Sequence, residues 1–246
     1  MDYDKDFEDG YEYTSLGAIH YLHHPGPKEK IIFLHGIGAY TKVWAKLVSF
    51  LPDELDVFLI DLLGHGESDA PQIDYNITNQ FQALREFVAL QNNGDSYLFG
   101  HSYGGWIAAY YAAQHNPTKG IILEDAAGSK EFFDSIESSG KEESYKEDLF
   151  NASMMISGNR DYVIRSILDS DFSEDQLTKE LLSEIKTRAL VLWGSKDATL
   201  DKKLGEGLAG NITGSQLKII EGAGHDPHYT NPKEVSEIIL GFIRQS

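Results

Sequence analysis

The stretch YLFGHSYGGWIAAYYAA, from Tyr97 to Ala113, joins a short apolar run to an alanine-rich segment. The apolar run is typical of a buried strand, and the alanine-rich part is typical of a helix. Ser102 lies at the junction, with Gly100 two positions before it and Gly104 two positions after it. A strand that turns sharply into a helix crowds its neighbours, so small residues are needed on both sides. The stretch therefore predicts a strand–turn–helix unit that presents the Ser102 hydroxyl.

This G-x-S-x-G pattern is that of a nucleophile elbow, in which the serine attacks a carbonyl carbon. The start of the following helix brings N–H groups and a positive dipole end to the serine oxygen. We therefore expect the N–H of Tyr103 to point to the place where an oxyanion would form. For this stretch alone, a helix-capping serine is the simpler alternative. A serine nucleophile also needs a base and an orienting acid, so the rest of the chain bears on the choice.

Strand-like and helix-like segments alternate around this elbow. A hairpin is expected around Gly17 in YTSLGAIHYLHH, and a helix is expected in AYTKVWAKLVSFL. Fully apolar runs predict buried strands at residues 31–35, 57–61 and 120–125. The alternation of strand-like and helix-like segments resumes in RALVLWGSKDATL and LKIIEGAGHD. Strands of this kind, alternating with helices, indicate a parallel sheet covered on both faces. Residues 128–184 lack such strands and are acidic and helix-like, so they are expected to form an insertion between two strands.

The loop that follows the strand in LVLWGSKDATL carries the candidate acid. Asp197 would lie at the carboxyl-end edge of the sheet, where open α/β proteins bind their ligands. A cap for a helix that starts near Thr199 is the alternative interpretation of this aspartate. Asp125 and Glu124, at the end of an earlier strand, are the rival acids.

The chain has nine histidines, and one of them follows the last strand in GAGHDPH. An exposed imidazole at this edge of the sheet suits proton transfer near neutral pH, so His225 is the expected base. His228, three residues further on, is the alternative. The order Ser102, Asp197, His225 is the one that the elbow architecture requires. A second oxyanion donor is expected in FLHGIG, where the N–H of Ile37 joins that of Tyr103.

Five motifs occur in order along the chain: HGIG, DLLGHGESDAP, GHSYGG, GSKD and GAGH. Together they resemble the α/β-hydrolase fold family, most of all its esterase, enol-lactonase and carbon–carbon-bond hydrolase branch. The resemblance implies a mostly parallel sheet of about eight strands flanked by helices, with a small helical cap after the sixth strand. Residues 1–127 and 185–246 would form the core, and residues 128–184 would form the cap, or lid. His65 and Ser68 would then belong to a structural loop and not to the catalytic set.

The substrate pocket is expected to involve side chains from the turn after the first buried strand and from the cap. These are His35, Phe132, Phe133, Met154 and Met155.

Composition excludes several classes of function. The formal net charge of −18 disfavours nucleic acid and anionic membranes as partners. The absence of cysteine excludes disulfides, thiolate metal sites and a cysteine nucleophile. No apolar run approaches the roughly 18 residues of a membrane span, and the acidic start lacks a signal-peptide core. We therefore expect a cytoplasmic monomer or homodimer without cofactor or metal, and His20, His23 and His24 are expected at its surface.

These features predict a serine hydrolase that cleaves carboxylic esters with small or medium acyl or aryl groups. It would act on a small-molecule substrate through an acyl-enzyme. The same catalytic residues also support carbon–carbon-bond (diketone) hydrolysis or lactone opening, because fold alone does not select among them. An alternative of another class is a slow-turnover ligand receptor that signals through its cap.

Overall fold

The computed structural model describes residues 5–91, 95–156, 158–170 and 175–245. Within them, eight strands form one sheet in the order β1-β2-β4-β3-β5-β6-β7-β8. Their bounds are β1 Glu8–Thr14, β2 Gly17–His24, β3 Lys30–Leu34, β4 Asp56–Ile60, β5 Ser96–His101, β6 Gly120–Glu124, β7 Arg188–Gly194 and β8 Gln216–Ile220.

The sheet is mostly parallel. β1 and β2 form the expected antiparallel hairpin, with Thr14 opposite Gly17. β2 is also antiparallel to β4, and every other pair in the sheet is parallel. Parallel strands bring their carboxyl ends to one edge, so the loops after β3, β5, β6, β7 and β8 meet there.

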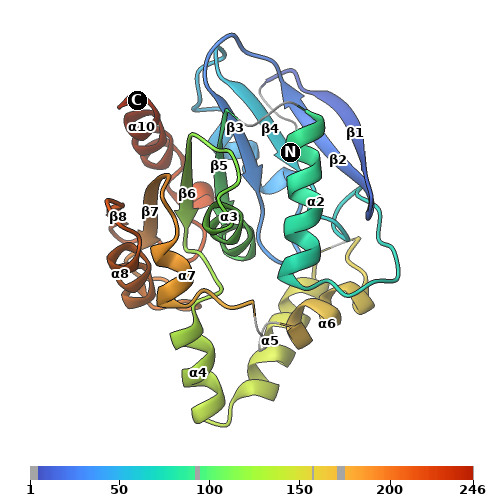
Figure 1. Ribbon diagram of the computed structural model, residues 1–246, viewed down its shortest axis with the longest axis vertical. Helices are drawn as coiled ribbons and strands as arrows, with labels where there is room; N and C mark the ends of the chain where they lie inside the picture. The colour runs from blue at the N-terminus through green and yellow to red at the C-terminus, as the bar shows by residue number, and fades with distance from the viewer. Residues whose placement is uncertain (1–4, 92–94, 157, 171–174, 246) are drawn as a thin grey trace.

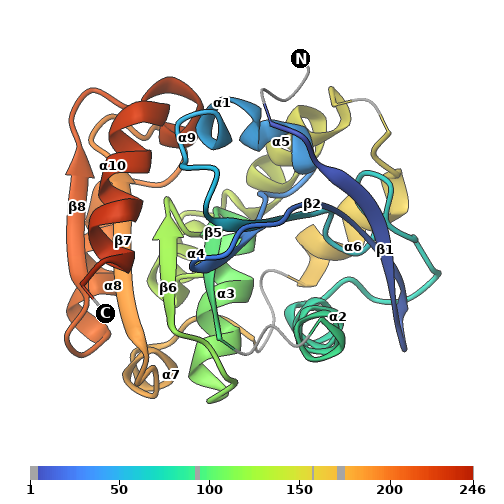
Figure 2. The same ribbon diagram turned by 90° about the horizontal axis from the view of Figure 1, so that it is seen from above.

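Helices cover both faces of the sheet. Figure 2 shows α1 and α10 on one side and α2, α3 and α7 on the other. The helices and the 3-10 helix η1 have the bounds η1 Thr41–Trp44, α1 Ala45–Val48, α2 Ile77–Leu90, α3 Tyr103–Ala113, α4 Lys130–Ser138, α5 Glu142–Met154, α6 Asp161–Ser170, α7 Lys179–Ser183, α8 Lys202–Asn211, α9 Pro227–Thr230 and α10 Pro232–Ile243.

Alternate residues of β3 pack into two apolar clusters, one on each face of the sheet. Ile31 and Phe33 of β3 belong to the apolar cluster that includes α1 and α10. Ile32 and Leu34 belong to the cluster that includes α2 and α3. Both faces of the strand are buried, which explains why its sequence is apolar throughout and does not alternate with polar residues.

The helix expected in AYTKVWAKLVSFL forms as two short pieces, η1 and α1. The buried carboxylate of Asp61 accepts a hydrogen bond from the N–H of Thr41, which fixes the start of η1. Trp44 is fully buried against the sheet. Attachment to the sheet at both of these points favours the tighter first turn over one continuous helix.

In the described part of the chain between β6 and β7 lie four helices, α4 to α7. α4, α5 and α6 extend beyond the sheet at the lower end of Figure 1, whereas α7 packs against α3. The two ends of the part that carries α4 to α6 lie side by side, because the N–H of Leu177 donates to the carbonyl of Gly128 at 2.7 Å. Among the described helices, none combines the length and the apolar character needed to cross a bilayer.

Candidate active site

Ser102 occupies a strained turn between β5 and α3. Its φ is 51° and its ψ is −114°, a region that residues other than glycine rarely adopt. Its N–H donates to the carbonyl of Glu124 at 3.0 Å, and its own carbonyl accepts from Trp106 at 3.1 Å and from Ala127 at 2.9 Å. The bonds with Glu124 and Ala127 of the neighbouring segment, together with the first-turn bond of α3, hold the unfavourable backbone in place.

The glycines beside Ser102 are needed for close backbone approach. A Cβ on Gly100 would overlap the carbonyl oxygen of Gly104, and a Cβ on Gly104 would overlap the carbonyl oxygen of Leu34. The geometry therefore accounts for the small residues on both sides of the serine.

Asp197 and His225 form a hydrogen-bonded pair. His225 Nδ1 lies 2.7 Å from Asp197 Oδ2, and the aspartate side chain is fully buried. Asp197 Oδ1 accepts from the N–H groups of Thr199 at 2.7 Å and Leu200 at 2.9 Å. Burial alone would raise the pKa of Asp197, but the bonds from His225 and from the backbone hold it below its usual value. An ionised carboxylate thus orients the imidazole.

The loops that carry this pair are tied together. Lys196 N donates to the carbonyl of Ala223 at 2.8 Å, and Ser195 N donates to that of Ile220 at 3.0 Å. A Cβ on Gly194 would overlap the carbonyl oxygen of Gly224. The distance between the acid and the imidazole is therefore set by the backbones of two loops as well as by their side chains.

Asp125, one of the rival acids, lies behind this pair. It is fully buried, and its Oδ1 accepts from the N–H of Gly194 at 3.0 Å. Burial and the neighbouring charge of Glu124 raise the pKa of Asp125 to about 10. Asp125 is therefore neutral at neutral pH, and Asp197 is the ionised acid beside His225.

Glu124, the other rival, binds a different histidine. His228 Nδ1 lies 2.6 Å from Glu124 Oε2, and both side chains are buried. His101 lies between the two histidines and donates from Nε2 to the carbonyl of His225 at 2.8 Å. Burial, together with the adjacent His228 and His225, lowers the pKa of His101 well below its usual value. No sequence signal pairs Glu124 with His228, because folding alone brings β6 and α9 together.

Ser102, His225 and His228 line one cavity of about 300 Å³. Ser102 and His225 face the same space but are not hydrogen-bonded to each other. Catalytic hydrogen bonds of this kind often tighten only when substrate is bound. No lysine or arginine lies among the described residues that line the cavity, so a neutral ligand fits it better than an anionic one.

One wall of the cavity comes from α5 and the residues just after it. Its members are Tyr145, Leu149, Ala152 and Ile156. Their spacing of four, three and four residues places them on one face of a helix. This apolar stripe faces the strained serine from the segment between β6 and β7.

The chain matches the alpha/beta hydrolase family over residues 31–238. It belongs to that family, and it is a hydrolase. Monoacylglycerol lipase abhd6-A of Xenopus laevis is 26% identical to this hydrolase, with 94% of this chain and 78% of the relative covered. Human monoacylglycerol lipase ABHD6 is 24% identical, with coverage of 92% and 82%.

Solved structures confirm the predicted fold of the hydrolase. A thermophilic esterase from Thermogutta terrifontis superposes with a TM-score of 0.80 at 20% identity, covering 97% of this chain and 98% of the esterase. The enol-lactonase from Burkholderia xenovorans LB400 gives a TM-score of 0.80 at 18% identity, covering 96% and 100%. These similarities establish the fold.

The side chains expected in the substrate pocket of the hydrolase lie outside the cavity. They are His35, Phe132, Phe133, Met154 and Met155. His35 is fully buried and accepts at Nε2 from the N–H of Leu62 at 2.9 Å. Phe133 packs on Trp106 in the core, whereas Met155 is 87% exposed. The phase of α5 turns both methionines away from the face that the stripe occupies.

The two expected oxyanion donors of the hydrolase both border the cavity. Ile37 follows β3, and its N–H donates to no described residue. Tyr103 is the first residue of α3, at the positive end of the helix dipole. This placement supports their predicted role, which remains a prediction.

His20 corrects one expectation about the surface. It is 2% exposed, and its Nδ1 lies 2.8 Å from a carboxylate oxygen of buried Asp61. The ring of Tyr11, the residue opposite His20 on β1, and the carboxylate of Asp61 flank the imidazole and bury it. His23 bonds Asp56 at 2.6 Å.

Among the residues that the structure describes, three clusters bring potential metal ligands within 4.8 Å of one another. They are His101, Glu124 and His228; Asp9, His20 and Glu67; and Asp125, Asp197 and His225. Each cluster contains a histidine nitrogen that already bonds a carboxylate. These hydrogen bonds account for the clustering, and the expectation of a metal-free enzyme remains a prediction.

Proposed function

We propose that this hydrolase cleaves neutral carboxylic esters with small or medium acyl or aryl groups. The supporting observation is the convergence of Ser102, in its strained turn, and the Asp197–His225 pair on one cavity. A strained serine beside an acid-oriented imidazole is the arrangement that activates a hydroxyl nucleophile.

Each residue then has a defined step. Ser102 Oγ attacks the carbonyl carbon while His225 Nε2 takes the hydroxyl proton. Asp197 holds Nδ1 and stabilises the imidazolium, and the N–H groups of Ile37 and Tyr103 hold the oxyanion. The imidazolium returns the proton to the leaving alcohol. A water, deprotonated by His225, then attacks the acyl-enzyme and releases the acid and Ser102.

The cavity supports this choice of substrate. Its volume of about 300 Å³ is at the small end of the range for small-molecule sites. The stripe from Tyr145 to Ile156 offers an apolar wall for an acyl or aryl group. We also infer that residues 128–184 act as a cap, because this wall belongs to them. The monoacylglycerol lipases similar to this chain are named for ester cleavage, so monoacylglycerols with short chains are candidate substrates.

The test is hydrolysis of p-nitrophenyl esters from acetyl to dodecanoyl by the wild type, Ser102→Ala and Ser138→Ala. Ser138 is exposed on α4 and serves as the matched control. We expect Ser102→Ala to lower kcat by at least about 10⁴-fold, while Ser138→Ala has no effect. Short and medium esters should be preferred.

Two other results would redirect the proposal. Turnover of lactones or diketones, but of no ester, would favour the alternative chemistries of the same residues. Tight ligand binding without Ser102-dependent turnover of any substrate would favour a receptor.

A further inference from the structure

We propose that His228, held by Glu124, forms a hydrogen-bonding subsite for a hydroxyl group on the alcohol part of the substrate. The inference rests on the proposed ester hydrolysis and names a narrower class: esters that carry a free hydroxyl near the bond to be cleaved.

The imidazole of His228 is fixed in orientation. Its Nδ1 bonds Glu124 Oε2 at 2.6 Å, and the ring is almost completely buried. The ring packs between Trp44 and His101, with both centroid separations 4.7 Å. A ring fixed by one short hydrogen bond and two aromatic neighbours presents the same edge at all times, which is a requirement for selective recognition.

The remaining nitrogen, Nε2, is the atom that this ring offers to a ligand. The ring makes no other hydrogen bond with a described residue, and His228 borders the cavity that contains Ser102 and His225. A polar atom at a cavity lined mostly by apolar residues favours a ligand that completes its hydrogen bond.

A hydroxyl group satisfies this nitrogen in either protonation state. A neutral ring that donates from Nδ1 has an acceptor at Nε2, and a protonated ring has a donor there. A hydroxyl does both, whereas a carboxylate only accepts. A carboxylate would also lie near two acids, Glu124 and Asp226, without a lysine or arginine among the described lining residues. Glu124 Oε1 has no hydrogen-bond partner among the described residues, so a carboxylate ligand would add further acceptors where a donor is already lacking.

The position of His228 assigns the hydroxyl to the alcohol part of the ester. His225 delivers its proton to the leaving alcohol oxygen, so the alcohol lies against the segment that contains His225. Asp226 and His228 continue that segment along the same cavity. The apolar stripe of α5 provides the wall that suits the acyl chain.

The experiment compares 1-monobutyrin with propyl butyrate, which share the acyl group and the number of alcohol carbons. The variants are His228→Asn, His228→Leu and the control His115→Leu. Asparagine keeps an N–H close to the position of Nδ1, so it retains the bond to Glu124 but lacks the second nitrogen. His115 is an exposed histidine on the far side of α3 from the cavity, beside Glu184.

We expect the wild type to favour monobutyrin by at least about 10-fold in kcat/KM, the value of one good hydrogen bond to a substrate hydroxyl. His228→Asn and His228→Leu should each bring the ratio of the two esters to within about 2-fold. His115→Leu should keep the wild-type ratio.

If the wild type has nearly the same kcat/KM for monobutyrin and propyl butyrate, the inference is overturned without any variant. It is also overturned if the wild-type preference persists in a folded His228→Asn variant. Equal loss of both esters in a variant that melts like the wild type would also overturn it, because His228 would then affect a step common to both esters and would not recognise the hydroxyl group. If the wild type hydrolyses neither ester in a Ser102-dependent way, the proposed function itself fails. That result is distinct from ester hydrolysis without hydroxyl preference.

Discussion

Asp125 and Asp197 hold their carboxyl groups within 4.8 Å of each other and of a nitrogen of His225. Two carboxylates this close do not both ionise. Burial raises the pKa of Asp125 to about 10, whereas the pKa of Asp197 is lowered by His225 and backbone N–H groups despite its burial. One acid is therefore neutral and the other charged, although both follow adjacent strands of the same sheet.

The difference in charge between the two acids predicts a large loss of activity for one amide variant and a small loss for the other. Asp197→Asn should lower kcat by about 10⁴-fold, because the amide favours the wrong imidazole tautomer. Asp125→Asn replaces a neutral acid with a neutral amide that still accepts from Gly194, so the loss should stay below about 10-fold. The measurement is kcat on p-nitrophenyl butyrate together with a melting curve. A larger loss in Asp125→Asn than in Asp197→Asn would reverse the assignment.

The contact between Gly194 and Gly224 predicts a second pair of variants. Gly194→Ala places a methyl group against the carbonyl oxygen of Gly224 and pushes the His225 loop away from Asp197. A displacement of about 1 Å is expected to cost about 10²-fold in kcat. Gly224→Ala is the matched control, because its Cβ would enter open space. Equal activity of the two variants would show that loop spacing does not set the geometry of the pair.

Three buried histidines predict how the protein unfolds in acid. Burial lowers the pKa of His35 and His101, and it lowers the pKa of His65 to about 3. Below a pH of about 6.5 the unfolded chain gains protons that the folded chain does not, so stability falls as the pH falls. Each such histidine adds about 1.4 kcal/mol per pH unit to the slope of the free energy of unfolding against pH.

The measurement is urea denaturation at several pH values between 5 and 6, a window set by the lowered pKa of His65. His65→Asn keeps a short N–H group but does not titrate, so its slope should be smaller by about 1.4 kcal/mol per pH unit. His115→Asn, at an exposed position, should keep the wild-type slope. An unchanged slope in His65→Asn would mean that His65 is protonated in the folded protein.

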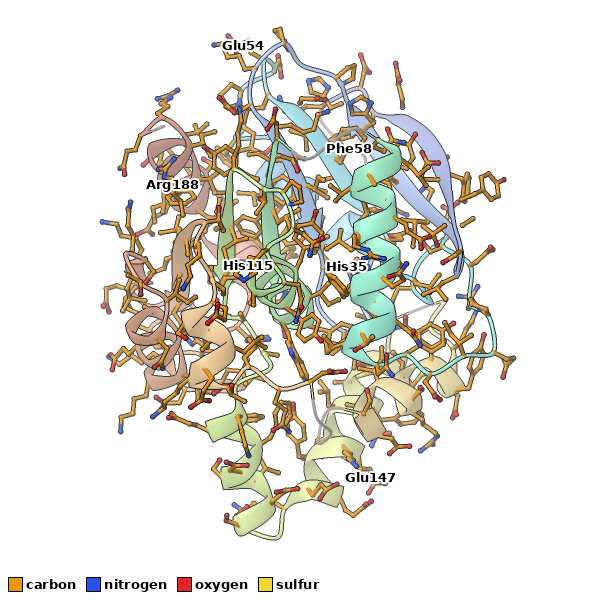
Figure 3. All side chains as sticks on the ribbon, in the orientation of Figure 1. His35, Glu54, Phe58, His115, Glu147 and Arg188 are labelled. Carbon is orange, nitrogen blue, oxygen red and sulfur yellow. The ribbon has the colours of Figure 1, made fainter. Side chains whose placement is uncertain are left out.

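The stripe on α5 predicts control of acyl length. Leu149→Trp should narrow the cavity and shift the preferred p-nitrophenyl ester toward acetyl, with at least about 10-fold loss on octanoyl. Glu147→Trp is the control, since Glu147 lies on the outer face of α5, at the end of the molecule opposite Glu54 (Figure 3). If both variants shift the profile equally, α5 does not form the acyl wall.

Much of this fold could be predicted from local sequence. Apolar runs without alternation require burial on both faces, and the run at β3 is buried in that way. Asp197 and His225 could be singled out because each follows a strand, and parallel strands bring those loops to one edge. The hairpin at Gly17 followed from its glycine between two strand-like runs.

The parts that the sequence did not predict depend on contacts between distant segments. Glu124 and His228 are 104 residues apart and meet only when β6 and α9 are in place. The burial of His20 depends on contacts with Tyr11 of β1 and with Asp61, which is 41 residues away in the sequence. The cavity wall, by contrast, could be predicted from the sequence, because Tyr145, Leu149 and Ala152 have the spacing of one helix face. The acidic residues between these positions make the stripe inconspicuous in the sequence.

The bridge between Gly128 and Leu177 has a practical consequence. Both ends of the helical segment meet at one hydrogen-bonded point beside the sheet, and a parallel bridge joins Ser129 to Leu177 there. The bridge fixes these two ends, whereas Val163 and Ile167 of α6 belong to the same apolar cluster as α2 and α3, so a replacement segment has to keep both the ends and α6. For protein engineering the exchangeable part is therefore α4 and α5, and a library of such replacements would vary the wall that α5 gives the cavity while Ser102, Asp197 and His225 stay where the strands hold them.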